Sequence, residues 1–392
     1  MALLYCLTPW GCEARRYPLS QVLKKLENAG PRGTQVGLHC LSVRSAFDLL
    51  LTSLHLPVGS EVLMTAANVP HMFEIVRRHG LIPVTFDLHT EDFAICEEDL
   101  KCKLNEKTSL VLIAHLFGGR TDLTPIVNHP HREDFVLVED CAQLFIGDYY
   151  PSHCLSDFQL FSFGPIKTAT ALGGGILCYP EDESCQRDSI GERFLEVSEA
   201  YPVQSRLQYA RRIMKYLFIK LLTTKLVFAV FYRLLRDPDR VLSSLAKNFN
   251  QSDLLEQLRV RPCIPLVRMM NRRMKGYKAS SMHSRTELGR SITDSVTRRH
   301  LIPGALCSEH RYWVFPIAAR EKREFVKRFR QQGFDATSTH SMEVQGPRDS
   351  HLSRLFENLV FIPFDSDLEA DEVGKIAELI DSSCDPTLPP SC

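Results

Sequence analysis

The sequence lacks the features that mark several common classes of protein. Lysine plus arginine and aspartate plus glutamate both number 47, so no net charge attracts nucleic acid or an acidic partner. Lysines interrupt every long apolar stretch, which argues against a transmembrane helix. No Gly-x-Gly-x-x-Gly motif follows the first predicted strand, which argues against a nicotinamide enzyme. We therefore predict no nucleic-acid partner and no nicotinamide cofactor.

The 13 cysteines lack a pattern as well. They form no Cys-x-x-Cys pair and no cluster with histidine at zinc spacing, so a disulfide framework or a structural metal site is not expected. We predict reduced thiols in a cytoplasmic protein and no metal site. The first ten residues have an apolar patch but no basic start and no small-residue cleavage site. We interpret residues 1–35 as an arm of the fold.

Short apolar runs alternate with helical patterns between residues 36 and 178. The helical patterns cover Ser45–Leu56 and Val69–His79. The predicted strands are Val36–Cys40, Glu61–Thr65, Ile82–Leu88, Ser109–Leu116, Phe135–Glu139, Phe158–Phe163 and Gly175–Cys178. This alternation predicts an α/β fold in which a mostly parallel sheet of seven strands is covered by helices. Ligands of such sheets bind beyond the carboxyl ends of the strands.

The remainder of the chain has a different pattern, typical of a smaller α+β lobe. From residue 256 onward, the predicted elements are a long helix Leu266–Leu288, a strand Tyr312–Ile317, a helix Arg320–Gln332, a strand Leu359–Pro363 and a helix Asp371–Ile380. At 392 residues, the chain is long enough for two domains or lobes.

Two predicted strands end in residues that suit one cofactor. The strand at 135–139 leads into Asp140, and the strand at 158–163 contains Ser162 and leads into Lys167 and Gly173–Gly175. Pyridoxal phosphate needs a carboxylate that keeps its pyridine nitrogen protonated, a hydroxyl for its phosphate and an amine that forms a Schiff base. Glycines allow the backbone to approach such a ring closely. We predict pyridoxal phosphate as the cofactor.

Each of these residues also has an ordinary interpretation. A lysine after a strand is most often a solvated surface charge, and an aspartate in the position of Asp140 often caps a helix. Gln143 is placed to contact the hydroxyl of the ring, or is simply exposed. The combination of acid, hydroxyl, lysine and glycines carries the prediction, and no single residue does.

The combined blocks resemble the DegT/DnrJ family of pyridoxal-phosphate-dependent (fold type I) sugar aminotransferases. The resemblance extends over nearly the whole chain, and the matching blocks stand in the order of the family. They are Val58–Val62, His115–Asp122, Glu139–Gln143, Phe161–Lys167, Asn271–Met274 and Leu359–Pro363. The resemblance implies the fold of these enzymes, in which a large cofactor-binding domain precedes a smaller C-terminal lobe.

The resemblance also implies roles for single residues. Lys167 would form the Schiff base and move protons, Asp140 would pair with the pyridine nitrogen, and Gln143 would contact the oxygen of the ring. Ser162 would bind the phosphate. Asn271 would reach the phosphate of the neighbouring subunit's cofactor, which implies a homodimer with shared active sites.

The chain departs from the family at two places around the cofactor. The family usually has Gly-Thr before its first helix, whereas this chain has Val43 and Arg44, with Ser42 before them. We expect this segment to bind the phosphate still, with Arg44 gripping it in a bidentate manner. The family also tends to place an aromatic residue over the ring, and here His71 is the predicted stacking residue.

Residues 206–236 contain many cations and no acid, interleaved with leucine, valine and phenylalanine. This pattern is typical of basic amphipathic helices that lie on a membrane surface. It is equally typical of helices that pack on the protein or on a second subunit. We therefore divide the chain into an arm (1–35), a large cofactor-binding domain (36–200), a basic amphipathic helical insertion (201–255) and a C-terminal small domain (256–392).

These features predict amino transfer as the function, and we consider one leading reaction and two alternatives. The leading reaction is transfer from an amino donor, glutamate, to a keto-sugar carried on a nucleotide, for cell-surface glycan or secondary-metabolite biosynthesis. The second possibility is an enzyme that uses the same cofactor but takes a lipid-linked or other membrane-bound acceptor at the inner face of the membrane. The third is a non-catalytic regulator or scaffold. Lysine at position 167 argues against the members of the family that dehydrate sugars, which have histidine there.

Overall fold

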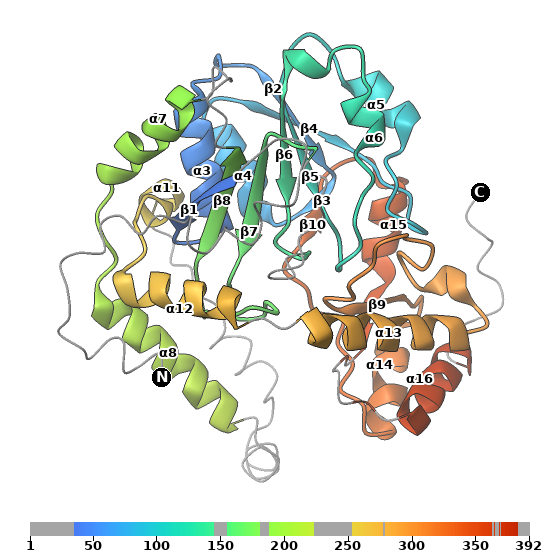
Figure 1. Cartoon of the computed structure of the whole chain (residues 1–392). Coiled ribbons are helices and arrows are strands. Elements are labelled where there is room, and N and C mark those ends of the chain that lie inside the picture. Colours follow the sequence, from blue (N-terminus) through green and yellow to red (C-terminus); the bar gives the residue numbers. More distant parts are fainter. Residues whose placement is uncertain are drawn as a thin grey trace.

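The computed structural model describes residues 35–144, 155–180, 188–222, 253–276, 279–362, 364, 368 and 370–382. Its main sheet has seven strands in the order β1-β8-β7-β6-β5-β2-β4 (Figure 1). The strands are β1 (Gln35–Cys40), β2 (Glu61–Thr65), β4 (Ile82–Phe86), β5 (Thr108–Ala114), β6 (Val136–Asp140), β7 (Phe158–Ser162) and β8 (Gly175–Pro180). From β4 to β7 the neighbours are parallel, while β8 is antiparallel to both β7 and β1. The predicted fold class is confirmed.

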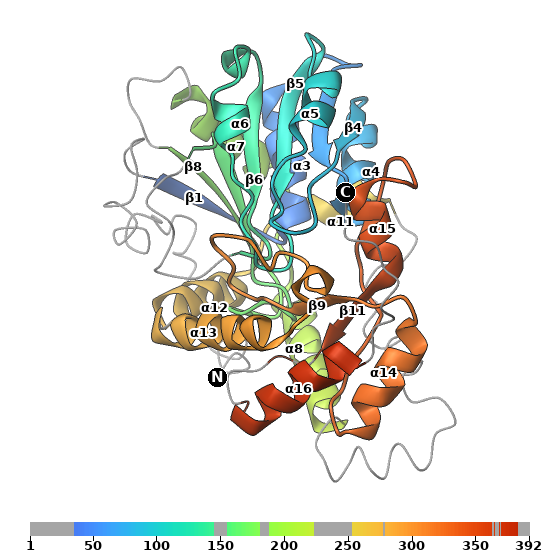
Figure 2. The same cartoon turned by 90° about the vertical axis from the view of Figure 1, so that its right-hand side faces the viewer.

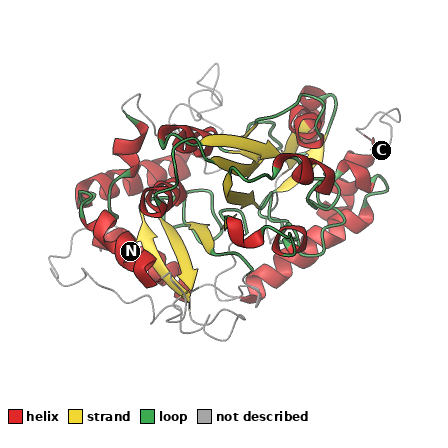
Figure 3. Ribbon diagram, turned by 90° about the horizontal axis from the view of Figure 1, so that it is seen from above, coloured by secondary structure: helices red, strands yellow, loops and turns green. Residues whose placement is uncertain are grey.

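Helices cover both faces of this sheet (Figure 3). Leu110 and Leu112 of β5 face one hydrophobic core, and Val111 and Ile113 face another. This alternation explains why the strand reads as a continuous apolar run. The first core is closed by α3 (Val43–Leu54), α4 (Pro70–Arg78), α7 (Asp188–Glu199) and α11 (Leu254–Leu258). The second is closed by α5 (Glu97–Lys103), α6 (Thr124–Val127) and α15 (His351–Asn358).

Helix α3 begins at the edge of the sheet where β1 ends. Ser42 is its N-cap, and the Ser42 hydroxyl accepts a hydrogen bond from the backbone N–H of Ser45 at 3.1 Å. Nearly every residue from Val43 to Leu51 is buried. A helix that is apolar on most of its surface must be covered on most sides, which fixes its N-terminus firmly against the sheet.

The C-terminal lobe lies beyond the carboxyl edge of the sheet (Figure 2). It contains the antiparallel pair β9 (Phe315–Ala318) and β11 (Leu359–Ile362), with α14 (Lys322–Gln331) and α16 (Ala370–Ser382) packed on the same core. The short strand β10 (Glu343–Val344) crosses back and pairs with β3 (Ala67–Asn68) of the large domain. The lobe thus returns to the neighbourhood of the sheet edge.

Two predictions in this lobe are wrong. The predicted helix Leu266–Leu288 is two helices, α12 (Ile264–Lys275) and α13 (Ala279–Ser295), because α12 ends at its C-cap Gly276. The predicted strand Tyr312–Ile317 starts only at Phe315. Tyr312 has a φ of 49°, a left-handed conformation that cannot belong to a strand.

The predicted insertion 201–255 is described in part, and residues 223–252 lie outside the described residues. Its described helix α8 (Arg206–Leu222) packs beside α12. Tyr209 of α8 is fully buried, and its hydroxyl donates a hydrogen bond to the carbonyl of Ala171 at 2.8 Å. One face of α8 therefore belongs to the body of the protein. None of the helices in the described ranges is both long enough and apolar enough to cross a bilayer.

Candidate functional site

The predicted site residues converge because four strands end or begin at one edge of the sheet. Asp140 ends β6, and Ser162 ends the neighbouring strand β7. Ser162 is paired with Gly175 at the start of β8, and Gly175 is paired in turn with Cys40 at the end of β1. The carboxyl edge of β6 and β7 therefore lies beside the loop that starts α3. This is the position in which open α/β sheets bind ligands.

Lys167 follows β7 in a tight turn, in which its backbone N–H donates to the carbonyl of Gly164 at 3.1 Å. The Lys167 amine lies 3.9 Å from the centre of the Trp313 ring. Burial lowers the pKa of Lys167 to about 8, while the negative charge of Asp140 acts in the opposite direction. A pKa near 8 gives a substantial fraction of neutral amine, which is the nucleophilic form.

Trp313 was not among the predicted site residues. Its indole N–H donates to the carbonyl of Ile166 at 3.0 Å, which holds the ring beside the lysine. The ring comes from the C-terminal lobe, whereas the lysine belongs to the large domain. A ring that faces an amine stabilises its charged form only modestly and shields it from water.

Asp140 is 7% exposed, and its Oδ1 accepts a hydrogen bond from the backbone N–H of Ala142 at 2.9 Å. Burial raises its pKa, against the opposing effects of that hydrogen bond and of the nearby Lys167 and His115 side chains. A buried carboxylate of this kind is stabilised further by any cation that binds beside it. A protonated ring nitrogen would be such a cation.

Glu139, the neighbour of Asp140, points to the other face of the sheet and supports the strand end. Its carboxylate accepts hydrogen bonds from His115 Nε2 at 3.0 Å and from the Ser156 hydroxyl at 2.6 Å. The backbone N–H of Thr121 donates to His115 Nδ1, so the proton of the ring is on Nε2. These bonds lower the pKa of Glu139 although its burial acts to raise it.

The ligand atoms of His115, Glu139 and Cys141 lie within 4.8 Å of one another, a spacing that a metal ion could bridge. Two of the three already bond to each other through the proton on His115 Nε2. We therefore interpret the trio as the structural support of β6, and its chemistry does not call for a metal.

Gln143 is held by the loop that follows β5. Its side-chain oxygen accepts from the backbone N–H of Phe117 at 2.7 Å, and its amide nitrogen lies 3.2 Å from the sulfur of Met342. Phe117 has a φ of 56° and Gly118 a φ of 99°, so this hydrogen bond anchors a tightly turned segment. The predicted contact of Gln143 with the ring oxygen stays a prediction.

The predicted phosphate end lies at the start of α3. A Cβ atom at Gly175 would lie 2.6 Å from the backbone carbon of Ser42 and 2.7 Å from the backbone nitrogen of Val43. Only glycine allows this approach, so the segment Gly173–Gly175, the glycine loop, forms one wall beside the N-terminus of α3. The half-buried Ser162 is paired with this same glycine, and its hydroxyl accepts from the N–H of Gly164 at 3.3 Å.

Arg44 and His71 contact each other at this end of the site. Arg44 Nη1 donates to His71 Nδ1 at 3.0 Å. Burial and the charge of Arg44 lower the pKa of His71. Burial and the charge of Arg212 lower the pKa of Arg44 to about 10. The sequence did not identify Arg212 as a site residue. No local pattern could have identified it, because α8 begins about thirty residues after the glycine loop.

Asn271 lies on α12, and its side-chain oxygen accepts from His39 Nε2 of β1 at 2.8 Å. Burial lowers the pKa of His39. The hydrogen bond joins α12 to the strand that leads into α3. The predicted reach of Asn271 toward a neighbouring subunit's cofactor stays a prediction.

The residues present fit pyridoxal phosphate. The loop beside them is tightly packed, since a Cβ at Gly174 would lie 2.2 Å from the sulfur of Met270. The donor set comprises an amine of lowered pKa at Lys167, a buried carboxylate at Asp140 and cations beside a helix N-terminus. An aldehyde, a pyridinium and a phosphate are the groups that these three features accept.

Residues 32–190 match the sequence profile described as the DegT/DnrJ/EryC1/StrS aminotransferase family. The chain is similar to that family over this range. The matched range contains the strands of the main sheet and both Asp140 and Lys167. The family resemblance is thereby confirmed for the part of the chain that builds the sheet edge. Helices α8 and α12 follow the matched range.

Curated relatives are similar over the same part of the chain. The pleiotropic regulatory protein of Geobacillus stearothermophilus is 29% identical over 178 residues, which cover 44% of this chain and 48% of that protein. GDP-perosamine synthase of Escherichia coli O157:H7 is 27% identical over 134 residues, which cover 34% of this chain and 37% of that protein. The chain thus spans less than half the length of these relatives.

Solved structures extend the likeness to the whole fold. The PLP-form of Spr1654, a proposed sugar aminotransferase of Streptococcus pneumoniae, superposes with a TM-score of 0.68 at 14% identity. The superposition covers 97% of this chain and 94% of that one. The C-terminal lobe therefore has the fold of these proteins even though its sequence has diverged.

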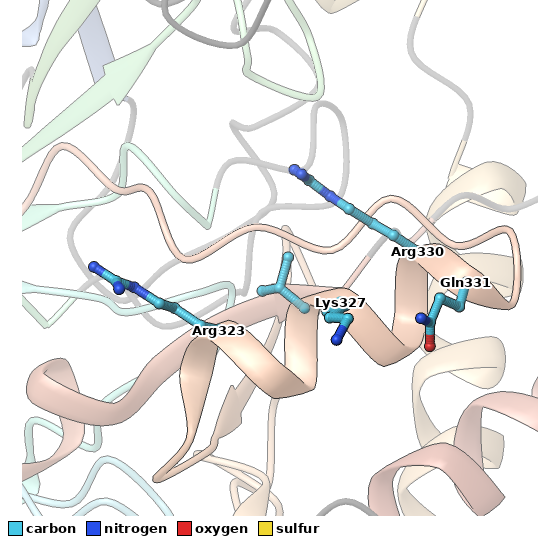
Figure 4. A pocket seen from close by; sticks show the side chains of 5 residues that line it. Arg323, Lys327, Arg330 and Gln331 are labelled. Atoms are coloured by element: carbon cyan, nitrogen blue, oxygen red, sulfur yellow. The ribbon is translucent and has the colours of Figure 1, made fainter. Parts of the chain in front are cut away.

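A surface depression elsewhere is unrelated to this site. It has a volume of about 370 Å³ and lies along α14, lined by Arg323, Val326, Lys327, Arg330 and Gln331 (Figure 4). Its lysine forms an ion pair with Glu324, and Arg330 forms one with Asp335. None of the residues predicted for the cofactor lies on this helix.

Proposed function

We propose that the chain is a pyridoxal-phosphate-dependent aminotransferase that moves an amino group from glutamate to a keto-sugar carried on a nucleotide. The observation that carries the proposal is the pairing of two features at neighbouring strand ends. A lysine with its pKa lowered to about 8 follows β7, and a buried carboxylate ends β6. The similarity to GDP-perosamine synthase supports a nucleotide-linked sugar as acceptor.

The chemistry follows from what these side chains do. Pyridoxal phosphate, when bound, supplies an aldehyde and an electron-withdrawing ring. Lys167, in its neutral form, would hold the aldehyde, and its amine would be the group that takes a proton from the substrate carbon and returns it. Asp140 would keep the ring nitrogen protonated, and the Glu139–His115 hydrogen bond holds its strand end in place. Trp313 and the glycine loop restrict water around the amine.

The first experiment measures cofactor attachment. The purified protein is mixed with pyridoxal phosphate, and the visible absorption band of the lysine-bound cofactor is recorded for the wild type, Lys167→Ala and Lys101→Ala. Lys101 is an exposed lysine paired with Glu97 on α5, so it serves as the matched control. We expect the band to be lost in Lys167→Ala alone. A band that survives the loss of Lys167 refutes the proposed attachment.

The second experiment identifies donor and acceptor. Addition of glutamate is expected to convert the aldehyde form of the cofactor to the amine form, and a nucleotide-linked keto-sugar is expected to reverse the conversion. A protein that binds the cofactor but converts it with no amino acid would instead be a non-catalytic regulator. The similarity to the pleiotropic regulatory protein is the observation that keeps this second candidate under test.

A membrane-linked acceptor is the remaining candidate, and the surface of α8 favours it. Leu207, Met214, Leu217 and Phe218 are each between 51% and 58% exposed. The helix carries five cations and no acid. Sedimentation with anionic and neutral vesicles tests this candidate in Leu217→Glu and Phe218→Glu. Loss of binding to anionic vesicles in these variants supports the membrane contact, and equal sedimentation of wild type and variants rules it out.

We also propose that the active unit is a homodimer in which both subunits contribute to each active site. Each chain would be built from the four segments 1–35, 36–200, 201–255 and 256–392. The position of Asn271 beside β1, on a helix that follows the family-matched range, supports this proposal. Light scattering of the purified protein measures the mass directly. A monomer that still converts the cofactor with glutamate would contradict shared sites.

A further inference from the structure

Arg212 lies against the glycine loop of the candidate site. A Cβ atom at Gly173 would lie 2.5 Å from Arg212 Nη1, so the guanidinium occupies the space that a side chain at 173 would need. Gly173 itself has a φ of 152°, which also favours glycine. Arg212 is half-buried, and it comes from α8, whose fully buried Tyr209 fastens the helix to Ala171 of the same loop.

Arg212 and Arg44 form a pair of like charges. The charge of Arg212 contributes to lowering the pKa of Arg44 and also that of Lys215. Within the described ranges, no carboxylate oxygen lies within 4.0 Å of Arg212. Two other arginines of the protein, Arg132 and Arg259, have such a partner.

The contrast with those arginines is informative. Arg132 pairs with Asp157 at 3.0 Å, and Arg259 pairs with Asp48 at 3.1 Å. A half-buried guanidinium is unfavourable unless an anion compensates it, and two of them near each other are more so. Arg212, which also lies near the like charge of Arg44, therefore has the electrostatics of a site for an anion that the described residues do not supply to it.

The surroundings specify the kind of anion. Arg44 is the second residue of α3, and the glycine loop packs on the backbone of Ser42 and Val43 at the start of this helix. Helix N-termini attract phosphate, and guanidinium groups bind it in a bidentate manner. Ser162, the predicted phosphate ligand, is paired in the sheet with Gly175 of the same loop. A phosphate monoester matches this combination of two cations, a hydroxyl and a helix end.

We propose that Arg44 and Arg212 together hold the phosphate of the cofactor, so that α8 completes a cofactor site whose other parts come from residues 32–190. The proposal rests on the proposed function, because it takes pyridoxal phosphate as the ligand. Arg212 supplies from outside the family-matched range the contact that a Gly-Thr segment would otherwise have made. The insertion would then contribute to the cofactor site, in addition to any contact of α8 with a membrane surface.

The test compares the dissociation constants of pyridoxal phosphate and of pyridoxal, which lacks the phosphate, in the full-length protein. The variants are Arg212→Ala, Arg212→Gln and Arg212→Lys, and Arg211→Ala is the matched control because Arg211 is the exposed neighbour on the same helix. We expect Arg212→Ala and Arg212→Gln to weaken pyridoxal phosphate roughly 10- to 100-fold. We expect pyridoxal to be unaffected, Arg212→Lys to be intermediate and Arg211→Ala to match the wild type.

Other outcomes overturn the proposal in distinguishable ways. Equal weakening of both ligands in the glutamine variant shows a general structural role for Arg212. An unchanged constant for pyridoxal phosphate, combined with weakened binding of uridine diphosphate, assigns Arg212 to the phosphates of the acceptor. A wild-type protein that binds no pyridoxal phosphate refutes the proposed function itself, and with it the proposed phosphate site of Arg44 and Arg212. Thermal unfolding of each variant identifies any that fail to fold, and the lysine and glutamine variants then decide the question.

Discussion

The lowered pKa of Lys167 has a direct consequence for its reactivity. The protonated amine cannot attack an aldehyde, and the neutral form becomes dominant as the pH rises through about 8. We predict that the initial rate of pyridoxal phosphate attachment to the cofactor-free protein increases between pH 7 and 9 and levels off above. Stopped-flow absorbance measures this rate. An increase that continues toward pH 10 would show that burial does not lower the pKa in the cofactor-free protein.

At the level of residues, the sequence predicts those site members that lie at strand ends. Asp140 and Lys167 could be placed at one edge because parallel neighbouring strands end together. Trp313 and Arg212 could not, because they reach the site through contacts between segments distant in sequence. His39 was missed for another reason: a histidine inside an apolar strand gives no sign that its ring bonds to Asn271.

At the level of elements, three helices are joined by one buried carboxylate. Asp48 of α3 is fully buried and pairs with His79 at the end of α4 at 2.8 Å and with Arg259 at the end of α11 at 3.1 Å. Asp48→Ala leaves these partners uncompensated, and we expect the free energy of unfolding to fall by about 3 kcal/mol. Urea denaturation measures the change.

The matched control for this prediction is Asp134→Ala, which removes an exposed ion pair with His131. Exposed pairs are screened by water, so this variant should differ little from the wild type. Equal losses in the two variants would mean that the link between α3, α4 and α11 contributes no more than a surface contact.

The helix that was predicted too long shows what periodicity cannot resolve. Met270 and Met274 of α12 pack on the core beneath the glycine loop, whereas Ile292 and Val296, at the end of α13 and just beyond it, pack in the core of the C-terminal lobe. Each stretch has helical spacing, but the two stripes face different cores. Only Gly276, a helix-terminating residue, marked the boundary in the sequence.

At the level of the whole molecule, the two lobes meet at Gly118. The carbonyl of Gly118 accepts a hydrogen bond from the N–H of Arg311, and a Cβ at Gly118 would lie 2.5 Å from the backbone nitrogen of Trp313. With a φ of 99° the position also disfavours any side chain. We predict that Gly118→Ala reduces the free energy of unfolding by about 2 kcal/mol or more.

The same variant should also displace Trp313 from Lys167, which slows attachment of pyridoxal phosphate. Gly374→Ala is the control, because a Cβ there meets nothing within 4 Å and alanine favours the helix α16. Equilibrium denaturation and the attachment rate are measured on both. Unchanged stability in Gly118→Ala would show that the lobes tolerate a wider separation than their contacts indicate.

The whole architecture was the part most accessible from the sequence. The strands of the sheet are covered on both faces, so their apolar runs identify them, and the intervening helical patterns require parallel crossovers. The arrangement of the C-terminal lobe was less accessible. Its strands are short, and it joins the large domain through the two-residue pair of β10 with β3 and through α15, which packs in the second core of the sheet.

The position of Trp313 has a practical consequence. The chain has two tryptophans, Trp10 and Trp313, and the second lies 3.9 Å from the amine that is proposed to receive the cofactor. Its indole emission overlaps the absorption of a bound pyridoxal chromophore, so excitation energy can pass between them over this short gap. The protein thus contains its own optical probe, and a Trp10→Phe background would let ligand arrival be followed by quenching without any added dye.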